Sequence, residues 1–404
     1  MNGNSTAEPR SSRKLIICID GTSQSPGTAS DVQSLGPFKA TAAMTPSNIT
    51  KLAFLANNPS APDQRVYYHS GPGTQSSDPI KAVLDSMFGN IKFNVYDAYA
   101  WLVREYQLGD EIYGFGFSRG AAIVRALFSI IGKQGLLDVR DFTNDDLTDD
   151  LLIRYITELL EEKETRLLVH RDVSVKFIGL FDTVIALGVP ASLDNVILPE
   201  VLKAFDVLES SEYDFNIGTK VQFAYHALSI DEKREFFAPT LFESSWLPQD
   251  HTREQVWFQG DHGDIGGGWW QLGLSMITLK WMIEKAESAG LQFRDFKYFE
   301  STLQPFLLGV HPNQLQQREK CLIHDYFHRV KPEDSFFGKE IPRQAKDYVA
   351  GKHATVFPST FHTSIELKME LENSDDIPID VGSETDTEGD LEDKCVASAS
   401  LRNI

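Results

Sequence analysis

Short apolar runs that end at glycine or polar turn residues recur along the first two thirds of the chain. The first, LIICID at Leu15–Asp20, stops at Gly21, and EIYGFGFS at Glu111–Ser118 is followed by Arg119 and Gly120. Apolar runs bounded by turn residues are typical of strands that are buried on both faces of a parallel sheet. The pattern predicts six such strands, and the other four lie at Gln64–Ser70, Val175–Val184, Val221–Leu228 and Gln255–Gly260.

Apolar residues at helical spacing separate these strands. The spacing predicts helices over Phe93–Tyr106 and Ala121–Leu137, and another that begins near Leu274. A highly charged stretch at 141–166, with Leu and Ile at helical spacing, predicts an inserted amphipathic helix that could form part of a cap. Strands that alternate with helices indicate an α/β fold with a mostly parallel sheet flanked by helices.

The polar ends of the chain differ from this central part. Residues 1–13 are polar and are expected to form a flexible leader, while 373–404 are acidic and nearly free of large apolar groups. Such a segment cannot bury enough apolar surface to offset its ordering entropy, so a disordered tail is expected. One catalytic domain is therefore expected over 14–372.

Charge and composition exclude several classes of function. The formal net charge of −20 makes nucleic-acid binding an unlikely role, because phosphate contacts require clustered Lys and Arg. The three cysteines form no CxxC pair, and no run of 18 or more apolar residues indicates a transmembrane span. The start of the chain also lacks the apolar stretch of a signal peptide. We expect a cytoplasmic protein without a membrane span. Transient membrane contact is compatible with the sequence. The sequence does not indicate the oligomeric state.

The candidate nucleophile is Ser118, in the G-x-S-x-G motif Gly116–Gly120. The motif follows a predicted strand and opens a predicted helix, as a nucleophile elbow requires. Glycines on both sides relieve crowding in so tight a turn, and the N–H of Arg119 at the start of the helix can donate to an oxyanion. The alternative interpretation is a glycine-rich turn without chemistry.

The candidate base is His262, in a glycine-rich loop expected beyond the strand QVWFQG. A base there could reach the nucleophile, and a histidine after the serine and the acid follows the α/β-hydrolase order. His226 is the main rival, although a histidine in the middle of a strand is more often a core residue.

The acid should lie between nucleophile and base. Asp182 closes the run KFIGLFD, and a strand end holds a carboxylate rigidly. The alternatives are Asp231 and Asp264, and an aspartate in an ordinary turn is the simpler interpretation of Asp182.

The turn after the first strand lies near the nucleophile in a parallel sheet. A backbone N–H of Gly21 or Thr22 is therefore a candidate second oxyanion donor, although the turn could equally be a plain connection. Asp20 and Asp264 could hold a cation, but no set of ligands is evident, and we expect no metal or organic cofactor.

Several separated blocks together resemble the family of α/β-hydrolases typified by type VI secretion phospholipase effectors, which has many uncharacterised fungal members. The blocks run from Leu15 to Leu291 and include CIDGT, GDEIYGFGFSRGAAIVRAL, GLFDTV, HALSIDEKREFFAP and VWFQGDHGDIGGGW. The resemblance implies a Ser–Asp–His triad at Ser118, Asp182 and His262. Asp261 and Gly263 stand where the family commonly has a small residue and Ser, and the Asp261 carboxylate is expected to raise the pKa of His262. The large C-terminal membrane-targeting domain of the bacterial effectors is not recognised.

These observations predict a serine hydrolase that forms an acyl-enzyme and cleaves carboxylic esters, with lipid or phospholipid acyl esters as the narrower expectation. The substrate would be a small-molecule or lipid ester. Thioester or amide hydrolysis on the same triad is one alternative. A non-catalytic hydrolase-like binding module is another, although it would not need both Ser118 and His262.

Overall fold

A computed structural model describes residues 12–21, 34–35, 38–39, 46–71, 91–140, 148–160, 169–173, 175–185, 214–234, 237–243, 248–269, 272–295, 343 and 360–361. Its centre is a seven-stranded sheet in the order β4-β1-β5-β8-β9-β10-β11, in which every neighbouring pair is parallel. The strands are β1 (Lys14–Ile19), β4 (Gln64–His69), β5 (Glu111–Phe117), β8 (Val175–Phe181), β9 (Val221–Ser229), β10 (Thr252–Phe258) and β11 (Thr360–Phe361).

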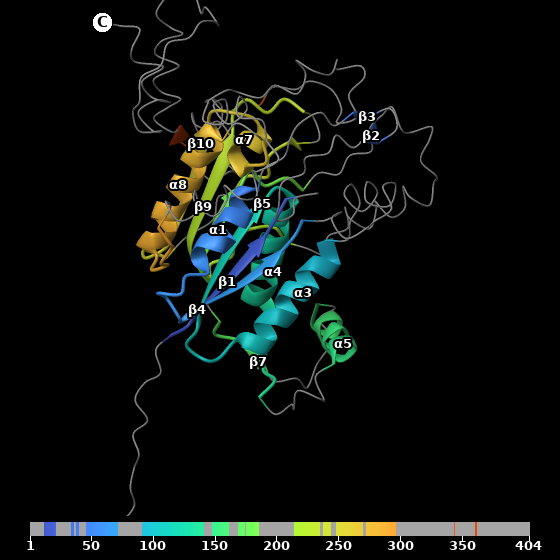
Figure 1. Cartoon of the computed structure of the whole chain (residues 1–404). Helices are drawn as coiled ribbons and strands as arrows, with labels where there is room; N and C mark the ends of the chain where they lie inside the picture. Colours follow the sequence, from blue (N-terminus) through green and yellow to red (C-terminus); the bar gives the residue numbers. More distant parts are fainter. Residues whose placement is uncertain are drawn as a thin grey trace, which may run out of the picture.

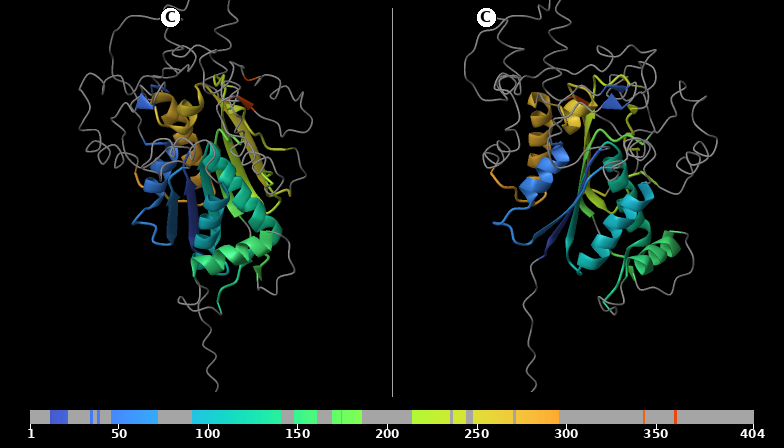
Figure 2. Two further views of the ribbon diagram at one scale, coloured as in Figure 1. Left: turned by 90° about the vertical axis from the view of Figure 1, so that its right-hand side faces the viewer. Right: turned by 45° about the vertical axis from the view of Figure 1, so that its right-hand side comes forward.

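Helices cover both faces of the sheet (Figures 1 and 2). One face carries α1 (Asn48–Ala56) and α8 (Gly273–Ser288), which contact each other. The opposite face carries α3 (Ile91–Glu105) and α4 (Arg119–Gln134). The buried apolar residues accordingly form two clusters, one on each face.

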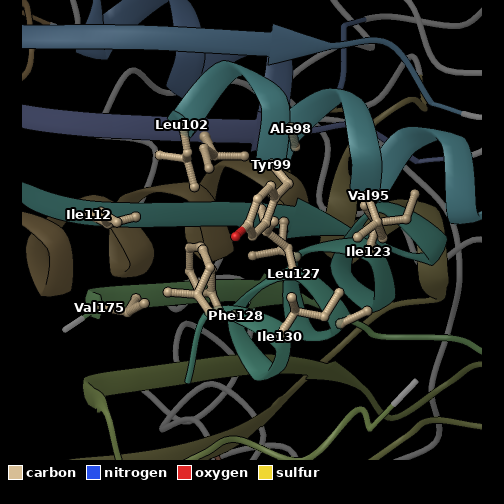
Figure 3. Packing of buried hydrophobic residues seen from close by; sticks show 14 of the residues in the cluster. Val95, Ala98, Tyr99, Leu102, Ile112, Ile123, Leu127, Phe128, Ile130 and Val175 are labelled. Atoms are coloured by element: carbon tan, nitrogen blue, oxygen red, sulfur yellow. The ribbon is translucent and has the colours of Figure 1, made fainter. Parts of the chain in front are cut away.

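The larger cluster fills the space between α3, α4 and the strands beneath them (Figure 3). Leu102 of α3, Leu127 of α4 and Ile112 of β5 are all fully buried there. The Tyr99 hydroxyl also lies inside this cluster, where it donates to the Gly135 carbonyl at 3.0 Å and accepts from the Leu137 amide at 3.1 Å. This packing fixes α4, and therefore the turn that precedes it, against the sheet.

All six predicted strands are present with boundaries close to those expected, and the α/β architecture is confirmed. The sequence analysis missed α1, the short edge strand β11, and two small antiparallel pairs, β2 (Ser34–Leu35) with β3 (Phe38–Lys39) and β6 (Leu136–Leu137) with β7 (Val169–His170). Most of the expected leader (1–11) and the entire expected tail (373–404) lie outside the described residues.

The expected insertion contains a helix, α5 (Asp149–Leu160). It packs against α3 and α4, where Leu152 is fully buried. Figures 1 and 2 show α5 at the end of the molecule that is remote from α7 (His262–Gly266). An amphipathic stretch predicts a buried face but not the surface that covers it, so the pattern did not indicate the packing of α5 on α3 and α4.

The strand order reverses between β1 and β5. The chain leaves β1 for the edge strand β4, then crosses back to β5 on the other side of β1. Ligands of open α/β sheets bind beyond the carboxyl ends of the strands at such a switch point. Asp20 follows β1 and Ser118 follows β5, so the structure places both candidate residues there.

None of the helices in the described part of the chain combines the length and apolar composition needed to cross a bilayer.

Candidate active site

Ser118 occupies a strained turn between β5 and α4. Its φ of 57° and ψ of −123° are rare for a residue with a side chain. The two flanking glycines are required sterically. A Cβ on Gly116 would lie 2.5 Å from the Ala121 Cα, and one on Gly120 would lie 2.3 Å from the carbonyl oxygens of Ile19 and Asp20. The motif therefore permits α4 to begin directly after the serine and to pack closely against the end of β1.

Backbone hydrogen bonds connect this turn to the end of β8. The Ser118 amide donates to the Phe181 carbonyl at 3.0 Å, and the Val184 amide donates to the Ser118 carbonyl at 3.4 Å. Asp182 lies between these two contacts, with a φ of 41°, and its own amide donates to the Ala227 carbonyl at 2.8 Å. Ser118 and Asp182 thus extend from neighbouring strands, each in an unusual backbone conformation.

Asp182 binds His262 directly. Its Oδ2 lies 2.7 Å from the His262 Nδ1, and its Oδ1 accepts from the Ser229 amide at 3.0 Å. Asp182 is fully buried and His262 is nearly so. This bond holds the imidazole by Nδ1, which directs Nε2 away from the carboxylate. No direct hydrogen bond joins the Ser118 hydroxyl to His262 among the described residues, and such contacts in free enzymes often form only with substrate.

His262 is the first residue of the short helix α7, where the sequence predicted a loop. Asp261 caps this helix by accepting from the Asp264 amide, and the Asp264 carboxylate accepts from the Asp261 amide in return. The His262 ring lies between Phe117 and Phe237, at centroid distances of 4.6 and 4.9 Å. The cap and the two aromatic rings fix the imidazole far more rigidly than a loop would.

The rival residues have other partners. The Asp231 carboxylate accepts from the Gly260 amide at 2.7 Å, and Asp264 serves the helix cap described above. His226 is fully buried, and its Nε2 accepts from the Thr183 amide at 3.0 Å. Burial, followed by the charge of Arg125, lowers the pKa of His226 to about 3, so this imidazole is neutral and supports the turn after Asp182.

Burial governs the electrostatics of His262. Desolvation lowers the pKa of its imidazole, and the hydrogen bond and charge of Asp182 offset that shift only in part. Burial alone would raise the pKa of Asp182, but the nearby charge of Arg343 and the bond to His262 hold it well below its usual range. The base is therefore neutral and the acid ionised near pH 7.

The expectation of a raised pKa for His262 is wrong, because burial sets the direction of the shift. The pKa of His262 is lowered, not raised. The Asp261 Oδ1 accepts from the Asp264 amide and from the Trp269 indole at 2.8 Å, so it serves the α7 cap. Burial, followed by the charges of Asp264 and Glu232, raises the pKa of Asp261 itself.

The turn after β1 contains a buried carboxylate with several donors. The Asp20 Oδ2 accepts from the hydroxyls of Ser47, Thr50 and Tyr68, at 2.7, 2.9 and 2.9 Å. Its Oδ1 accepts from the Gly21 amide at 2.8 Å, so this amide is engaged and would have to leave Asp20 to serve an oxyanion. Thr22, the other candidate donor, lies outside the described residues.

Neither aspartate considered for a cation has a ligand set around it. Hydroxyls and an amide surround Asp20, while Asp264 binds a helix cap. Among the described residues, no group of three or more His, Cys, Asp or Glu side chains is arranged to hold a metal ion.

The sequence analysis missed three charged side chains around the Asp182–His262 pair. The Glu232 carboxylate accepts from the His262 amide at 3.2 Å and forms an ion pair with Arg234 at 2.6 Å. Arg343 binds Asp182 from a distant part of the chain, with Nη1 2.6 Å from Oδ1. Glu232 lies in the block HALSIDEKREFFAP, which pointed to its region without giving its role. No pattern in the sequence singles out Arg343.

Known proteins resemble parts of the chain. The uncharacterized protein YEL023C of Saccharomyces cerevisiae is 28% identical over 265 residues, which are 59% of this chain and 34% of the yeast protein. The chain therefore spans about a third of the length of this curated relative.

Two solved structures also resemble the chain. One is the Tle1 effector bound to the VgrG spike from the type 6 secretion system, with 20% identity and a TM-score of 0.36 over 64% of this chain and 51% of that one. The other is an uncharacterized protein from Pseudomonas aeruginosa, with 17% identity and a TM-score of 0.38 over 76% of this chain and 48% of that one. The chain spans about half the length of either.

The profile of one protein family matches residues 13–285, which include the turn at Ser118, the end of β8 and all of α7. Its description is T6SS, phospholipase effector Tle1-like, catalytic domain. Because the match extends over more than half of the sequence, the chain belongs to the family of Tle1-like T6SS phospholipase effectors, in their catalytic domain.

Proposed function

We propose that this protein is a serine hydrolase that cleaves carboxylic esters, with lipid acyl esters as its substrate class. The observation that carries the proposal is the strained Ser118 at the start of α4, next to a buried Asp182–His262 pair. Membership of a phospholipase effector family supports lipid esters as the class of substrate.

The proposed reaction begins with attack of the Ser118 hydroxyl oxygen on the ester carbonyl carbon, while His262 Nε2 takes the hydroxyl proton. Asp182, bound to Nδ1 at 2.7 Å, selects the tautomer with a free Nε2 and stabilises the imidazolium. The N–H of Arg119 lies in the first turn of α4, where the amides and the helix dipole favour a developing oxyanion. Thr22 is the candidate second donor, because the Gly21 amide donates to Asp20.

Collapse of the tetrahedral intermediate breaks the ester C–O bond, and His262 returns its proton to the departing alkoxide. The acyl group is then bonded to Ser118. A water molecule attacks this acyl-enzyme with His262 again as the base, and the carboxylic acid leaves with Ser118 restored. The lowered pKa of His262 keeps the imidazole unprotonated, and therefore able to accept a proton, at the start of each half-reaction.

The test compares the full-length chain with Ser118→Ala. We expect a fluorophosphonate probe to label the wild type and not the variant. Hydrolysis of p-nitrophenyl butyrate should fall by about 10⁴-fold or more, with an unchanged melting temperature. Normal turnover by Ser118→Ala would refute the serine mechanism. Release of fatty acid from phosphatidylcholine vesicles tests the lipid class separately, and turnover of short esters alone would refute that narrower part.

A further inference from the structure

Arg343 binds both oxygens of the Asp182 carboxylate. Its Nη1 donates to Oδ1 at 2.6 Å and its Nη2 to Oδ2 at 3.0 Å. Only 5% of the Arg343 side chain is exposed, and Asp182 is fully buried. This is the bidentate geometry, in which a guanidinium donates two hydrogen bonds to one carboxylate.

The guanidinium is itself fixed by the surrounding backbone. Nη1 donates to the Ser229 carbonyl at 2.8 Å, and Nη2 donates to the Phe237 carbonyl. Ser229 ends β9, and Phe237 packs its ring against His262. Arg343 therefore links three parts of the site: the acid, the strand end that supports the acid, and the segment that covers the base.

These contacts determine the orientation of the carboxylate. Oδ1 accepts from the Ser229 amide and Arg343, while Oδ2 accepts from His262 and Arg343. Without Arg343, each oxygen would keep one of these two partners. The carboxylate could then rotate, and its Oδ2 would no longer be restricted to the position 2.7 Å from Nδ1.

We propose that Arg343 is a positioning residue of this active site, which holds Asp182 in the rotamer that presents Oδ2 to His262. This inference rests on the proposed serine hydrolase function. Arg343 lies beyond residues 13–285, so the inference extends the functional unit past the region that the family profile matches. A catalytic unit that ended near α8 would contain all three triad residues and still lack the group that orients its acid.

The positive charge of Arg343 also affects the pKa of His262. A change in the pH dependence of catalysis would therefore distinguish a role in the active site from a role in fold stability alone. Asp182, Glu232 and Arg234 act electrostatically on His262, and Asp261 and Asp264 lie on its own helix. Arg343 offsets the charge of Asp182, so its removal leaves the imidazolium with stronger net stabilisation. A rotated Asp182 carboxylate stays close to the ring, so loss of the Arg343 charge should outweigh the weaker hydrogen bond. The pKa of His262 should therefore rise, and the acid limb of kcat/KM should move to higher pH.

The experiment compares three variants of the full-length chain. Arg343→Gln removes both the positive charge and the bidentate hydrogen bonding to Asp182, and Arg343→Lys keeps only the charge. Arg13→Gln is the matched control, because Arg13 forms a similar buried pair with Asp110, with Nη2 2.7 Å from Oδ2, where β1 begins. On p-nitrophenyl butyrate we expect Arg343→Gln to lose roughly 100-fold in kcat with little change in KM, the scale expected when a catalytic group is misplaced by about 1 Å.

The acid limb should move to higher pH in Arg343→Gln and stay near its wild-type position in Arg343→Lys, which should recover only part of kcat. Arg13→Gln should change neither quantity, even if its melting temperature falls. The inference would be overturned if Arg343→Gln kept its kcat and its pH profile, or if Arg13→Gln lost as much kcat.

A second measurement covers the case in which Arg343→Gln folds poorly. Guanidinium ion at low millimolar concentration should restore part of the kcat of Arg343→Ala, because the ion can occupy the space left beside Asp182. Absence of rescue in a folded Arg343→Ala variant would count against positioning. Fluorophosphonate labelling of the wild type keeps the two proposals distinct. An unlabelled wild type refutes the serine hydrolase, whereas equal labelling rates for the wild type and Arg343→Gln refute only the role of Arg343.

Discussion

Replacement of Asp182 by asparagine should inactivate the protein by imposing the wrong tautomer on His262. An amide keeps the shape of the carboxylate but has one acceptor and one donor edge. In the structure, the Oδ1 position faces two donors, the Ser229 amide at 3.0 Å and Arg343 Nη1 at 2.6 Å. The Oδ2 position faces only one fixed donor, Arg343 Nη2. The amide oxygen must therefore take the Oδ1 position, and the NH₂ group must face His262.

An NH₂ group 2.7 Å from Nδ1 requires that nitrogen to be the acceptor, which places the imidazole proton on Nε2. Nε2 then has no lone pair with which to accept the Ser118 proton. In a serine protease with the same triad, this substitution costs about 10⁴-fold in kcat. We expect a loss of roughly 10³ to 10⁴ here, with KM almost unchanged because the acid does not touch the substrate.

The assay is kcat and KM on p-nitrophenyl butyrate for Asp182→Asn, with Asp231→Asn and Asp264→Asn as matched controls. These controls remove carboxylates that bind the Gly260 and Asp261 amides, so each should cost far less than Asp182→Asn. If either control proves crippling while Asp182→Asn keeps activity within tenfold of wild type, the acid has been wrongly assigned.

Loss of stability must be separated from loss of chemistry. Asp182→Asn leaves the Arg343 charge buried without its counter-ion, which can destabilise a fold by roughly 3–5 kcal/mol. The double variant with Arg343→Gln removes that charge as well. Its melting temperature should return toward the wild-type value while its kcat stays low. Recovery of both quantities together would mean that the single variant was merely unfolded.

Two further predictions follow from the same site. Because burial lowers the pKa of His262, kcat/KM should be constant near pH 7 and fall as pH drops through a value below about 6.5, which a pH–rate profile measures; an acid limb above pH 7 would contradict the stated electrostatics. Gly120→Ala should strongly reduce the yield of folded protein, because its Cβ would lie 2.3 Å from two carbonyl oxygens, whereas Gly132→Ala in the same helix meets nothing within 4 Å and should raise stability by about 1 kcal/mol, as thermal unfolding can show.

The sequence predicted those parts of the molecule that local pattern determines. Each main strand except β11 is a distinct apolar run, and the requirement for glycine at 116 follows from the turn itself, whereas the requirement at 120 comes from contact with the end of β1. Chain order and strand ends were enough to pair Asp182 with His262. What was missed depends on contacts between distant segments. The two-residue strand β11 is too short to show a period, and it is recognisable only from its pairing with β10.

Electrostatics was the least predictable feature. From the sequence, Asp261 beside His262 suggested a raised pKa for the histidine. In the structure its Oδ1 accepts from the Trp269 indole and a helix amide, while the effect of burial exceeds that of nearby charge. Adjacency along the chain does not establish which way a carboxylate points, whereas burial depends on the packing of Phe117 and Phe237 around the ring.

Two carboxylates bind His262, Asp182 at the ring and Glu232 at the backbone amide, and each has an arginine of its own. Asp182 pairs with Arg343 at 2.6 Å, and Glu232 pairs with Arg234 at 2.6 Å. A lone buried carboxylate would stabilise the imidazolium at rest and thus leave the base already protonated. Because an arginine offsets the charge of each carboxylate, burial has the largest effect on the pKa of His262, and the resting imidazole is uncharged. The hydrogen bond between His262 and Asp182 persists, and it still favours the imidazolium once a proton arrives from Ser118. The two arginines therefore oppose protonation of the resting imidazole, but they leave in place the contact that stabilises the imidazolium during the reaction.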